Sequence, residues 1–326
     1  MRLLLRTISC SSQPRKQHFT PSSILQEALY RSHILRNTVV GTWKTIYQQR
    51  RMGQERAMVS AMTDVCQNVD GLYIGRVPML SDNYSWILHD APSGSTAVVD
   101  PAEEEPIVRA LESRGWTLTH ILNTHHHWDH TGGNLALKER YKNLTIVGPR
   151  ADRERIPGID VELEDGDVLY LGTSKMQCFD TPGHTKGHVT YYFKDAKALF
   201  PGDTLFLMGC GRLFEGTPED MWHSLSKLVR LPRDTMVYCA HEYTLSNAKF
   251  AVHVDPSNPA LQKRFKEVEE CRKNGIPTVP SSLGVELDTN PFLRPWSKEI
   301  RSTLHIHDDA SDSEAFGVIR KAKDSF

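Results

Sequence analysis

The amino-acid sequence lacks the features that mark several classes of protein. No apolar run comes near the ~20 residues that a membrane-spanning helix needs, so no membrane partner is expected. The six cysteines include no C-x-x-C pair and no spacing typical of a disulfide framework, which favours a reducing compartment. Acidic residues are nearly missing from residues 1–60, where two of them stand against ten Lys and Arg. These absences argue against a membrane-spanning protein and against a disulfide-stabilised scaffold.

The rest of the chain is acidic. Residues 61–326 carry 29 basic and 38 acidic side chains, by subtraction from the chain totals of 39 and 40, which gives a net charge of −9. Nucleic acid is therefore not expected as a partner, because its phosphates attract positively charged surfaces. Any site for an acidic ligand has to be a small local patch of basic residues. Hydrophobic residues, at 39%, are enough for a core, and a monomer is expected.

The first 60 residues differ in composition from the rest. They are basic, contain several serines and begin with an apolar stretch, Leu3 to Leu5, that is too short for a secretory signal. This composition predicts an organelle transit peptide in residues 1–60, and its arginine content favours the mitochondrion over the chloroplast. The alternative is an N-terminal extension that stays attached to a cytoplasmic protein.

The most informative stretch is THHHWDH at residues 124–130. His125, His127 and Asp129 are spaced two apart, and His130 follows directly. Imidazole nitrogens and carboxylate oxygens are the ligands that borderline divalent metals such as zinc accept. A short apolar strand is predicted before the run and a helix after it, which places these side chains on a strand-to-helix loop. A solvated histidine-rich loop is the alternative, but low-complexity tracts lack this internal spacing.

Three further candidate ligands each follow a predicted strand. His184 lies in a Pro-Gly turn, Asp203 ends an apolar strand, and His241 follows another strand. Taken singly, such residues are more often turn or cap residues than ligands. Two metals ~3.5–4 Å apart lower the pKa of a water between them, so a hydrolase built this way needs no Ser or Cys nucleophile. The predicted arrangement places one metal on His125, His127 and His184 and a second on Asp129, His130 and His241, with Asp203 as the bridge.

The periodicity along the chain predicts mixed strands and helices. Alternating apolar residues predict strands at 72–77, 84–88 and 96–100, and a 3.6-residue period predicts a helix at 103–114. This order favours sheets flanked by helices, an α/β (α+β) fold, over a simple parallel series. From about residue 256 the pattern becomes charged and helical, and no strand is predicted there. Further strands are predicted at 118–122, 144–147, 176–179, 189–193, 198–200 and 236–239, and further helices at 134–141, 221–229, 261–273 and 311–323.

Taken together, the candidate ligands resemble those of the metallo-β-lactamase superfamily. The segments GCGRLFEGT (209–217), NPFLR (290–294) and RKAKD (320–324) make the chain similar, more narrowly, to glyoxalase II, the family of hydroxyacylglutathione hydrolases. The resemblance covers residues 71–326 and implies an αββα sandwich with a helical C-terminal domain and two divalent metal ions, zinc, iron or manganese. The domains expected are the transit peptide at 1–60, a metal-binding domain at 71–255 and a helical glutathione-binding domain at 256–326.

The family's glutathione contacts carry over by position to five residues. The basic residue after Cys-Gly falls on Arg212, the aromatic two places beyond it on Phe214, and the tyrosine after His-Glu on Tyr243. The basic tail pair falls on Arg320 and Lys323. Such cations suit the carboxylates of glutathione. Spacing alone would also fit solvated cations and, for the two aromatic residues, positions in the core.

Two positions depart from the family pattern. Ala240 stands where relatives usually have glycine, beside His241, and a methyl group there would be strained if the backbone needed a positive φ. Phe214 stands where relatives can have tyrosine, so one hydrogen bond to the substrate, worth ~1 kcal/mol, would be missing.

The activity that the resemblance implies is hydrolysis of S-D-lactoylglutathione to glutathione and D-lactate. Asp129 and Asp203 are the expected catalytic residues, because they would hold the metals and orient the attacking water. The alternatives are a glutathione persulfide dioxygenase with mononuclear iron and a non-catalytic glutathione-binding relative. The segment LFEGT after Cys-Gly-Arg, the basic tail and the presence of every expected ligand favour the hydrolase.

Overall fold

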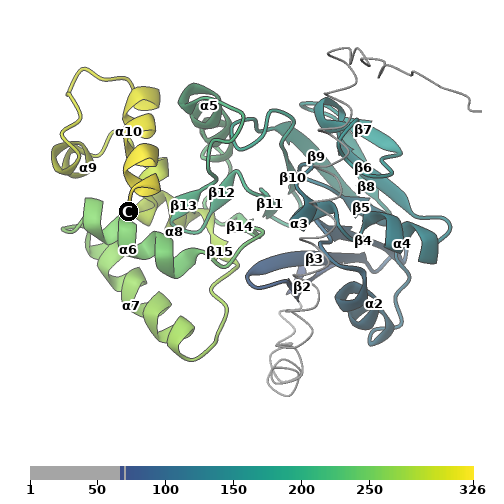
Figure 1. Ribbon diagram of the computed structural model, residues 1–326. Helices are drawn as coiled ribbons and strands as arrows, with labels where there is room; N and C mark the ends of the chain where they lie inside the picture. The colour runs from purple at the N-terminus through teal and green to yellow at the C-terminus, as the bar shows by residue number, and fades with distance from the viewer. Residues whose placement is uncertain (1–66, 70) are drawn as a thin grey trace, which may run out of the picture. The chain divides into compact units, whose positions relative to one another are not determined.

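The structure, a computed structural model, describes residues 67–69 and 71–326, and the transit peptide predicted at 1–60 lies outside the described residues. Two β-sheets stack on one another with helices on their outer sides, and a helical region follows at the C-terminus (Figure 1). The predicted αββα sandwich with a helical C-terminal part is therefore confirmed. Every strand and helix predicted above overlaps an observed element.

The first sheet holds seven strands in chain order, antiparallel from β1 to β4 and parallel from β4 to β7. Both of its faces are buried. On β3, Trp86 and Leu88 enter the core between the sheets, whereas Ile87 packs beneath the outer helices, because successive strand residues point to opposite faces. The strands are β1 Gln67–Val69, β2 Leu72–Met79, β3 Asn83–Asp90, β4 Ser95–Val99, β5 His120–Leu122, β6 Thr145–Pro149 and β7 Val161–Leu163.

The second sheet has the order β15-β14-β11-β10-β9-β8. Its strands contribute Met176, Tyr191 and Phe200 to the same core as Trp86 and Leu88, so the two sheets share one hydrophobic interior. The strands are β8 Val168–Leu171, β9 Ser174–Asp180, β10 Val189–Phe193, β11 Ala198–Phe200, β14 Met236–Val237 and β15 Ser281–Ser282, with a separate hairpin of β12 Leu205–Phe206 and β13 Gly209–Cys210.

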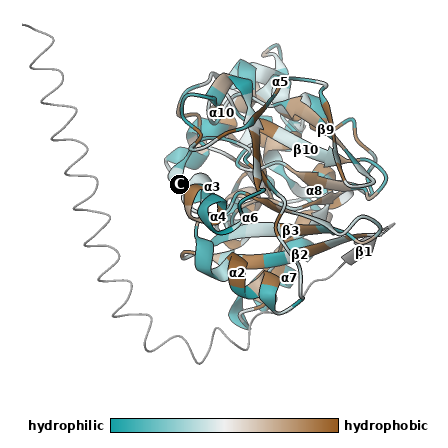
Figure 2. Ribbon diagram, turned by 90° about the vertical axis from the view of Figure 1, so that its right-hand side faces the viewer, coloured by the Kyte–Doolittle hydropathy of each residue, from teal (hydrophilic) through white to brown (hydrophobic). Residues whose placement is uncertain are grey.

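The outer helices are amphipathic. α2 buries Ile107, Val108 and Leu111 on one face, as its sequence period predicts, and Figure 2 shows hydrophobic and hydrophilic residues side by side on this helix. α5 begins at Pro218, and Thr217 and Asp220 form a capping box at its N-terminus. The helices of this part are α2 Glu104–Glu112, α3 Trp128–Thr131, α4 Asn134–Arg140 and α5 Pro218–Leu228.

The C-terminal region corrects one expectation. It was predicted to contain no strand, yet Ser281 and Ser282 form β15, which pairs antiparallel with Met236 and Val237 of β14. A pair of serines has no alternating apolar pattern, so only the backbone hydrogen bonds at the sheet edge define this strand. The boundary predicted at residue 256 stays a prediction. The helices are α6 Thr244–Val254, α7 Pro259–Lys273, α8 Leu283–Thr289, α9 Lys298–Thr303 and α10 Asp312–Asp324, and none of the described helices is long and apolar enough to cross a bilayer.

Candidate metal centre

The candidate ligands follow β5, β9, β11 and β14, and two of them, Asp129 and His130, lie on the short helix α3 after β5. The loop after β5 is held by Asp100, which follows the neighbouring parallel strand β4. Asp100 Oδ1 accepts a hydrogen bond from the Thr124 N–H, and Oδ2 accepts one from the Thr124 hydroxyl, both at 2.7 Å. The first residue of the THHHWDH run therefore has a fixed position, from which the ligand side chains project.

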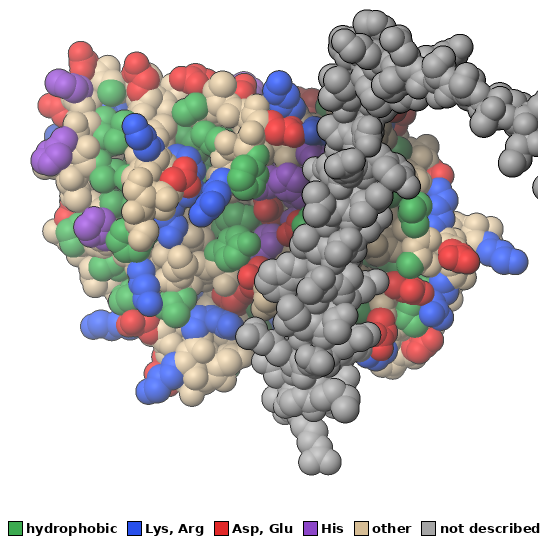
Figure 3. All heavy atoms as spheres, viewed as in Figure 1, with side chains coloured by type: hydrophobic (Ala, Val, Ile, Leu, Met, Phe, Trp, Pro, Cys, Tyr) green, Lys and Arg blue, Asp and Glu red, His purple; other side chains and the backbone are tan. Residues whose placement is uncertain are grey.

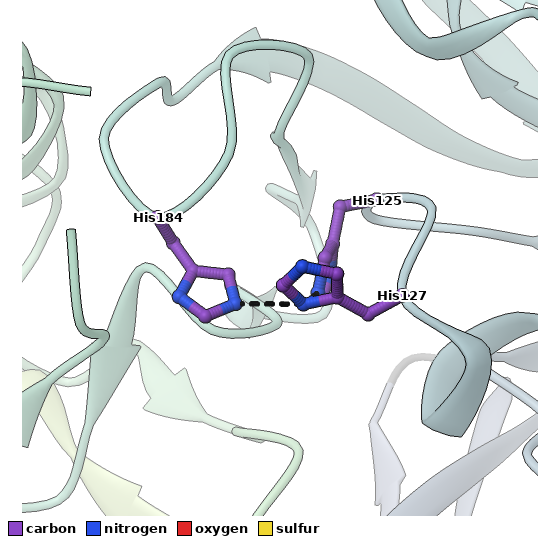
Figure 4. A group of neighbouring side chains, drawn as sticks. All are labelled: His125, His127 and His184. Atoms are coloured by element: carbon purple, nitrogen blue, oxygen red, sulfur yellow. Dashed lines mark hydrogen bonds between the residues drawn. The ribbon is translucent and has the colours of Figure 1, made fainter. Parts of the chain in front are cut away.

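Three imidazoles form the first group. His125 Nε2 lies 3.0 Å from His127 Nδ1, and His184 Nε2 lies 3.1 Å from the same atom (Figure 4). The outer nitrogens of two of these rings have hydrogen-bond partners, since His125 Nδ1 is 3.0 Å from the Thr124 hydroxyl and His184 Nδ1 is 2.8 Å from the Arg212 carbonyl. A ring that donates from its outer nitrogen presents a lone pair at its inner nitrogen, as a metal ligand must.

The second group joins a carboxylate to two imidazoles. Asp129 Oδ2 lies 3.5 Å from His130 Nε2 and 3.6 Å from His241 Nε2. The outer nitrogens again face acceptors, with His130 Nδ1 3.0 Å from Asp100 Oδ2 and His241 Nδ1 2.9 Å from Asp82 Oδ1. Each imidazole of the second group is thus oriented by a carboxylate outside it.

Asp203 lies between the two groups. Its Oδ2 is 3.4 Å from His184 Nε2, whereas its Oδ1 is 3.4 Å from both His130 Nε2 and His241 Nε2. The side chain is buried, and Oδ1 has no hydrogen-bond partner among the described residues. A buried carboxylate oxygen without a partner is costly, so this position calls for a cation. The donor set and this oxygen fit the pair of divalent metals that the sequence predicts.

Electrostatics also differ between the two groups. Burial, followed by the neighbouring histidines, lowers the pKa of His127 to about 4 and holds that of His125 well below its usual value. In the second group burial acts in the same direction, but the carboxylates of Asp203, Asp100 and Asp129 outweigh it and raise the pKa of His130 to about 10. At neutral pH and without a metal the first group is therefore uncharged, whereas the carboxylates hold His130 of the second group protonated, a positive charge that a bound cation would replace.

Sequence reasoning missed three supporting residues. Asp100 orients both Thr124 and His130, Asp82 orients His241, and Asn83 donates to Asp129 Oδ2 at 3.0 Å. Asp100 had a usable signal, because it follows an apolar strand just as Asp203 does. Asp82 and Asn83 lie between two predicted strands, where such residues indicate only a turn.

Two side chains within the motif lie outside both groups. His126 donates its backbone N–H and approaches with Nδ1 the buried carboxylate of Asp152, at 3.2 and 2.8 Å. The Trp128 side chain is 69% exposed. Trp128 is the first residue of the short helix α3, whose buried residues are His130 and Thr131.

Aromatic side chains border the imidazoles. The Tyr243 ring stacks on His241 with centroids 4.6 Å apart, and the exposed Phe214 ring lies 5.2 Å from His184. Ala240, at the position usually occupied by glycine, is not among the described residues with positive φ, and its carbonyl accepts the Tyr84 N–H. The methyl group is therefore tolerated without backbone strain.

The three predicted basic residues have different surroundings. Arg212 is exposed, with Nε 3.9 Å from Asp324 Oδ1. Arg320 is buried, donates to the Cys210 carbonyl at 2.9 Å and pairs with Asp324 at 2.8 Å. Lys323 is half-buried and donates to the Ser246 carbonyl, 3.2 Å away. Figure 3 shows histidine and acidic side chains at the centre of one face, with basic and hydrophobic side chains beside them. The assignment of the histidines and aspartates as metal ligands, and of the basic and aromatic residues as substrate contacts, stays a prediction.

Comparisons of the sequence match both parts of this structure. The family model of the metallo-beta-lactamase superfamily matches residues 81–241, and that of the hydroxyacylglutathione hydrolase C-terminus matches residues 242–326. A hydroxyacylglutathione hydrolase of Methylococcus capsulatus is 54% identical over 78% of this chain and 99% of its own length. Another, from Maricaulis maris, is 51% identical over 78% of this chain and 99% of its own length.

Solved structures share the fold. A metallo-beta-lactamase from Staphylococcus aureus superposes with a TM-score of 0.54 at 18% identity, over 79% of this chain and 72% of its own. The BLEG-1 B3 metallo-beta-lactamase has a TM-score of 0.52 at 23% identity, over 68% of this chain and 99% of its own. At such low identity these likenesses concern the fold alone.

Proposed function

Because the chain belongs to the hydroxyacylglutathione hydrolases of the metallo-beta-lactamase superfamily, we propose that it hydrolyses S-D-lactoylglutathione to glutathione and D-lactate. The relatives that carry this name align over nearly their whole length, so both the metal-binding part and the C-terminal part are represented in this chain. The thioester hydrolase activity follows from the family, and the identity of the acyl group is the finer part of the proposal.

The observation that carries the proposed chemistry is the placement of Asp203. Its two oxygens face different imidazole groups, and the one without a hydrogen-bond partner faces His130 and His241. We propose that His125, His127 and His184 hold one divalent ion and that Asp129, His130 and His241 hold another, with Asp203 shared. Such ions supply Lewis acidity toward the thioester carbonyl and lower the pKa of a water.

The residues around the metals have proposed roles of their own. Asn83 fixes Asp129 by donating to Oδ2, so this carboxylate keeps one orientation toward the reacting water. Tyr243 and Phe214 flank the imidazoles, where they are proposed to contact the substrate. The thiolate leaves readily, because a free cysteine thiol has a pKa of only ~8.5.

We propose that Arg212 and Lys323 bind the carboxylates of glutathione and that the buried Arg320 adds its charge to the same patch. Asp324 marks where a carboxylate fits, because its Oδ1 lies 2.8 Å from Arg320 Nη2 and 3.9 Å from Arg212 Nε. Lys323 is close enough to both arginines for their charges to contribute, after burial, to lowering its pKa. A local cationic patch on an otherwise acidic chain suits an anionic tripeptide.

The deciding experiment measures metal content per chain together with thiol release from S-D-lactoylglutathione. Two divalent ions per chain and rapid thiol release are expected, and Asp203→Ala is expected to abolish the release. Oxygen consumption with glutathione persulfide and one iron per chain would instead indicate the dioxygenase. Two bound metals without turnover of the thioester would indicate a non-catalytic relative.

We propose further that residues 1–60 direct the protein to the mitochondrion. The support is their basic, serine-containing composition, and the fact that about a fifth of the chain has no counterpart in the aligned relative from Methylococcus capsulatus. A fusion of residues 1–60 to a fluorescent protein is expected to reach mitochondria. A chloroplast or cytoplasmic signal would contradict the proposal.

A further inference from the structure

The hairpin β12–β13 links two parts of the site. It begins just after Asp203, and two residues past its end lies Arg212, whose carbonyl is 2.8 Å from His184 Nδ1. Phe206 of β12 packs edge-on against His241 and Tyr243, with ring centroids 5.7 and 5.2 Å apart. Where this hairpin lies therefore affects ligands of both groups and the nearest predicted substrate contact.

Side chains from the C-terminal region, which lies beside the hairpin, form hydrogen bonds with the backbone of its turn (Figure 1). Asn247 of α6 donates to the Leu207 carbonyl at 3.1 Å. Asn290 donates to the carbonyls of Phe206 and Gly209, at 3.2 and 3.1 Å. Glu286 of α8 accepts the Met208 N–H, with 2.6 Å between Met208 N and Glu286 Oε2.

Glu286 is an unusual choice for a purely structural position. Its side chain is fully buried, and its second oxygen has no hydrogen-bond partner among the described residues. A buried carboxylate is costly, and an apolar residue would generally stabilise such a site better. Its one backbone partner, Met208, has φ of 53°, a left-handed conformation that non-glycine residues rarely adopt. The Glu286 carboxylate therefore holds the one residue of the turn, Met208, whose backbone conformation is unfavourable by itself.

We infer that Glu286 is a positioning residue for the thioester hydrolase reaction, which holds the Met208 turn so that Phe206 and Arg212 lie correctly against the metal ligands. Asn290 reinforces it by donating to the same carboxylate oxygen at 3.3 Å. The inference rests on the proposed function for its kinetic consequence, but the hydrogen bond itself makes a separate prediction about the hairpin.

The test compares Glu286→Leu, which removes the acceptor at similar size, with Glu286→Gln, which keeps a carbonyl oxygen for the Met208 N–H. In the full-length protein loaded with metal, Glu286→Leu is expected to lower kcat/KM for S-D-lactoylglutathione about 10- to 100-fold, as a misplaced active-site element does. Its metals should also be removed faster by a chelator, because the Arg212 carbonyl no longer orients His184. Glu286→Gln should restore both properties to near those of the unaltered protein.

Hydrogen exchange gives the readout that does not depend on activity. The peptide containing residues 205–212 should exchange faster in Glu286→Leu and at the normal rate in Glu286→Gln. Asp255→Asn is the matched control, since Asp255 is also a buried C-terminal acid but forms its side-chain hydrogen bonds with Asn258 and Arg294, which are not hairpin residues. Exchange of the hairpin should be unchanged in this control.

Three results would overturn the inference: normal hairpin exchange in Glu286→Leu, no rescue by Glu286→Gln, or equal effects in the Asp255 control. If Glu286→Leu fails to fold, Asn247→Ala tests the same turn through its Leu207 bond, and unchanged exchange and KM would refute the proposal. An unaltered protein without thioesterase activity would refute the proposed function, while the exchange and metal-release results would still decide whether Glu286 holds the turn.

Discussion

Asp100→Asn should selectively weaken the second metal site. The Asp100 carboxylate receives three donors, the Thr124 N–H and hydroxyl and His130 Nδ1. An asparagine has only one acceptor oxygen. We expect this oxygen to take the place of Asp100 Oδ1, because the backbone N–H of Thr124 that donates there is fixed. The amide nitrogen then faces His130 Nδ1, which has to become an acceptor. The proton of His130 consequently moves to Nε2, the nitrogen that faces Asp129 and Asp203, and that atom can no longer bind a cation.

The expected size of this effect follows from the role of such partners. Loss of the group that orients a histidine ligand reduces metal affinity by ~10- to 100-fold, which corresponds to ~1.4–2.8 kcal/mol. Here the tautomer itself is reversed, so the upper part of that range is expected. The first group should lose less, because Asp100 acts on it indirectly, through the Thr124 hydroxyl that lies beside His125 Nδ1.

The assay is titration of loaded protein with a chromophoric chelator, with metals counted by mass spectrometry. Asp100→Asn is expected to release one metal at much lower chelator concentration and to retain the other. The matched control is Asp152→Asn, since Asp152 is equally buried but contacts His126, which is not a predicted ligand. Equal and unchanged affinities at both sites in Asp100→Asn would refute the proposed orientation of His130.

The remaining predictions concern the substrate and pH. Lys323→Ala is expected to raise KM with little change in kcat, as lost ground-state binding does, whereas Lys321→Ala, at an exposed position of the same helix, should change neither. An unaltered KM would exclude Lys323 from the substrate site. Phe214→Tyr adds a hydroxyl beside the imidazoles and should lower KM up to ~5-fold through one hydrogen bond of ~1 kcal/mol; a fall in kcat alone would contradict this. The Arg155 guanidinium lowers the pKa of Glu215 from 4.5 to about 2, so its stabilising contribution is complete above pH 4.5 and is lost as the pH falls toward 2. Glu215→Gln should therefore lower the Tm at neutral pH, and the difference from the unaltered protein should disappear near pH 2; a constant difference would refute the linkage.

The fold was predictable because its signals are local. Strand alternation in residues 84–88 and helical periodicity in 103–114 each depend on neighbours in the sequence, and both elements form. The grouping of His125, His127, Asp129 and His130 after one strand was equally accessible, since their short spacing decides it. The more distant candidates were accessible only because each follows a strand, and strand ends of a sandwich meet at a common edge.

Contacts between distant segments set the limit of sequence reasoning. Arg320 was expected on a substrate-facing or solvated helix face. Its side chain is instead 6% exposed, and its guanidinium donates a hydrogen bond to the Cys210 carbonyl. Helical periodicity says which residues share a face of α10 but not which loop covers that face. β15 escaped prediction for the related reason that a strand as short as Ser281–Ser282 is defined by its partner and not by its own residues.

Asp203 and Glu286 show why burial of a carboxylate does not by itself reveal its purpose. Both side chains are buried, and in each one oxygen has no hydrogen-bond partner among the described residues. The surroundings decide between them. Asp203 faces the inner nitrogens of three imidazoles, which together with it form the donor set of a metal site, whereas Glu286 faces a backbone N–H and an amide and is already used by the protein. The partner of Glu286 lies 78 positions away in the sequence, so its role follows only from the turn that the fold places against α8.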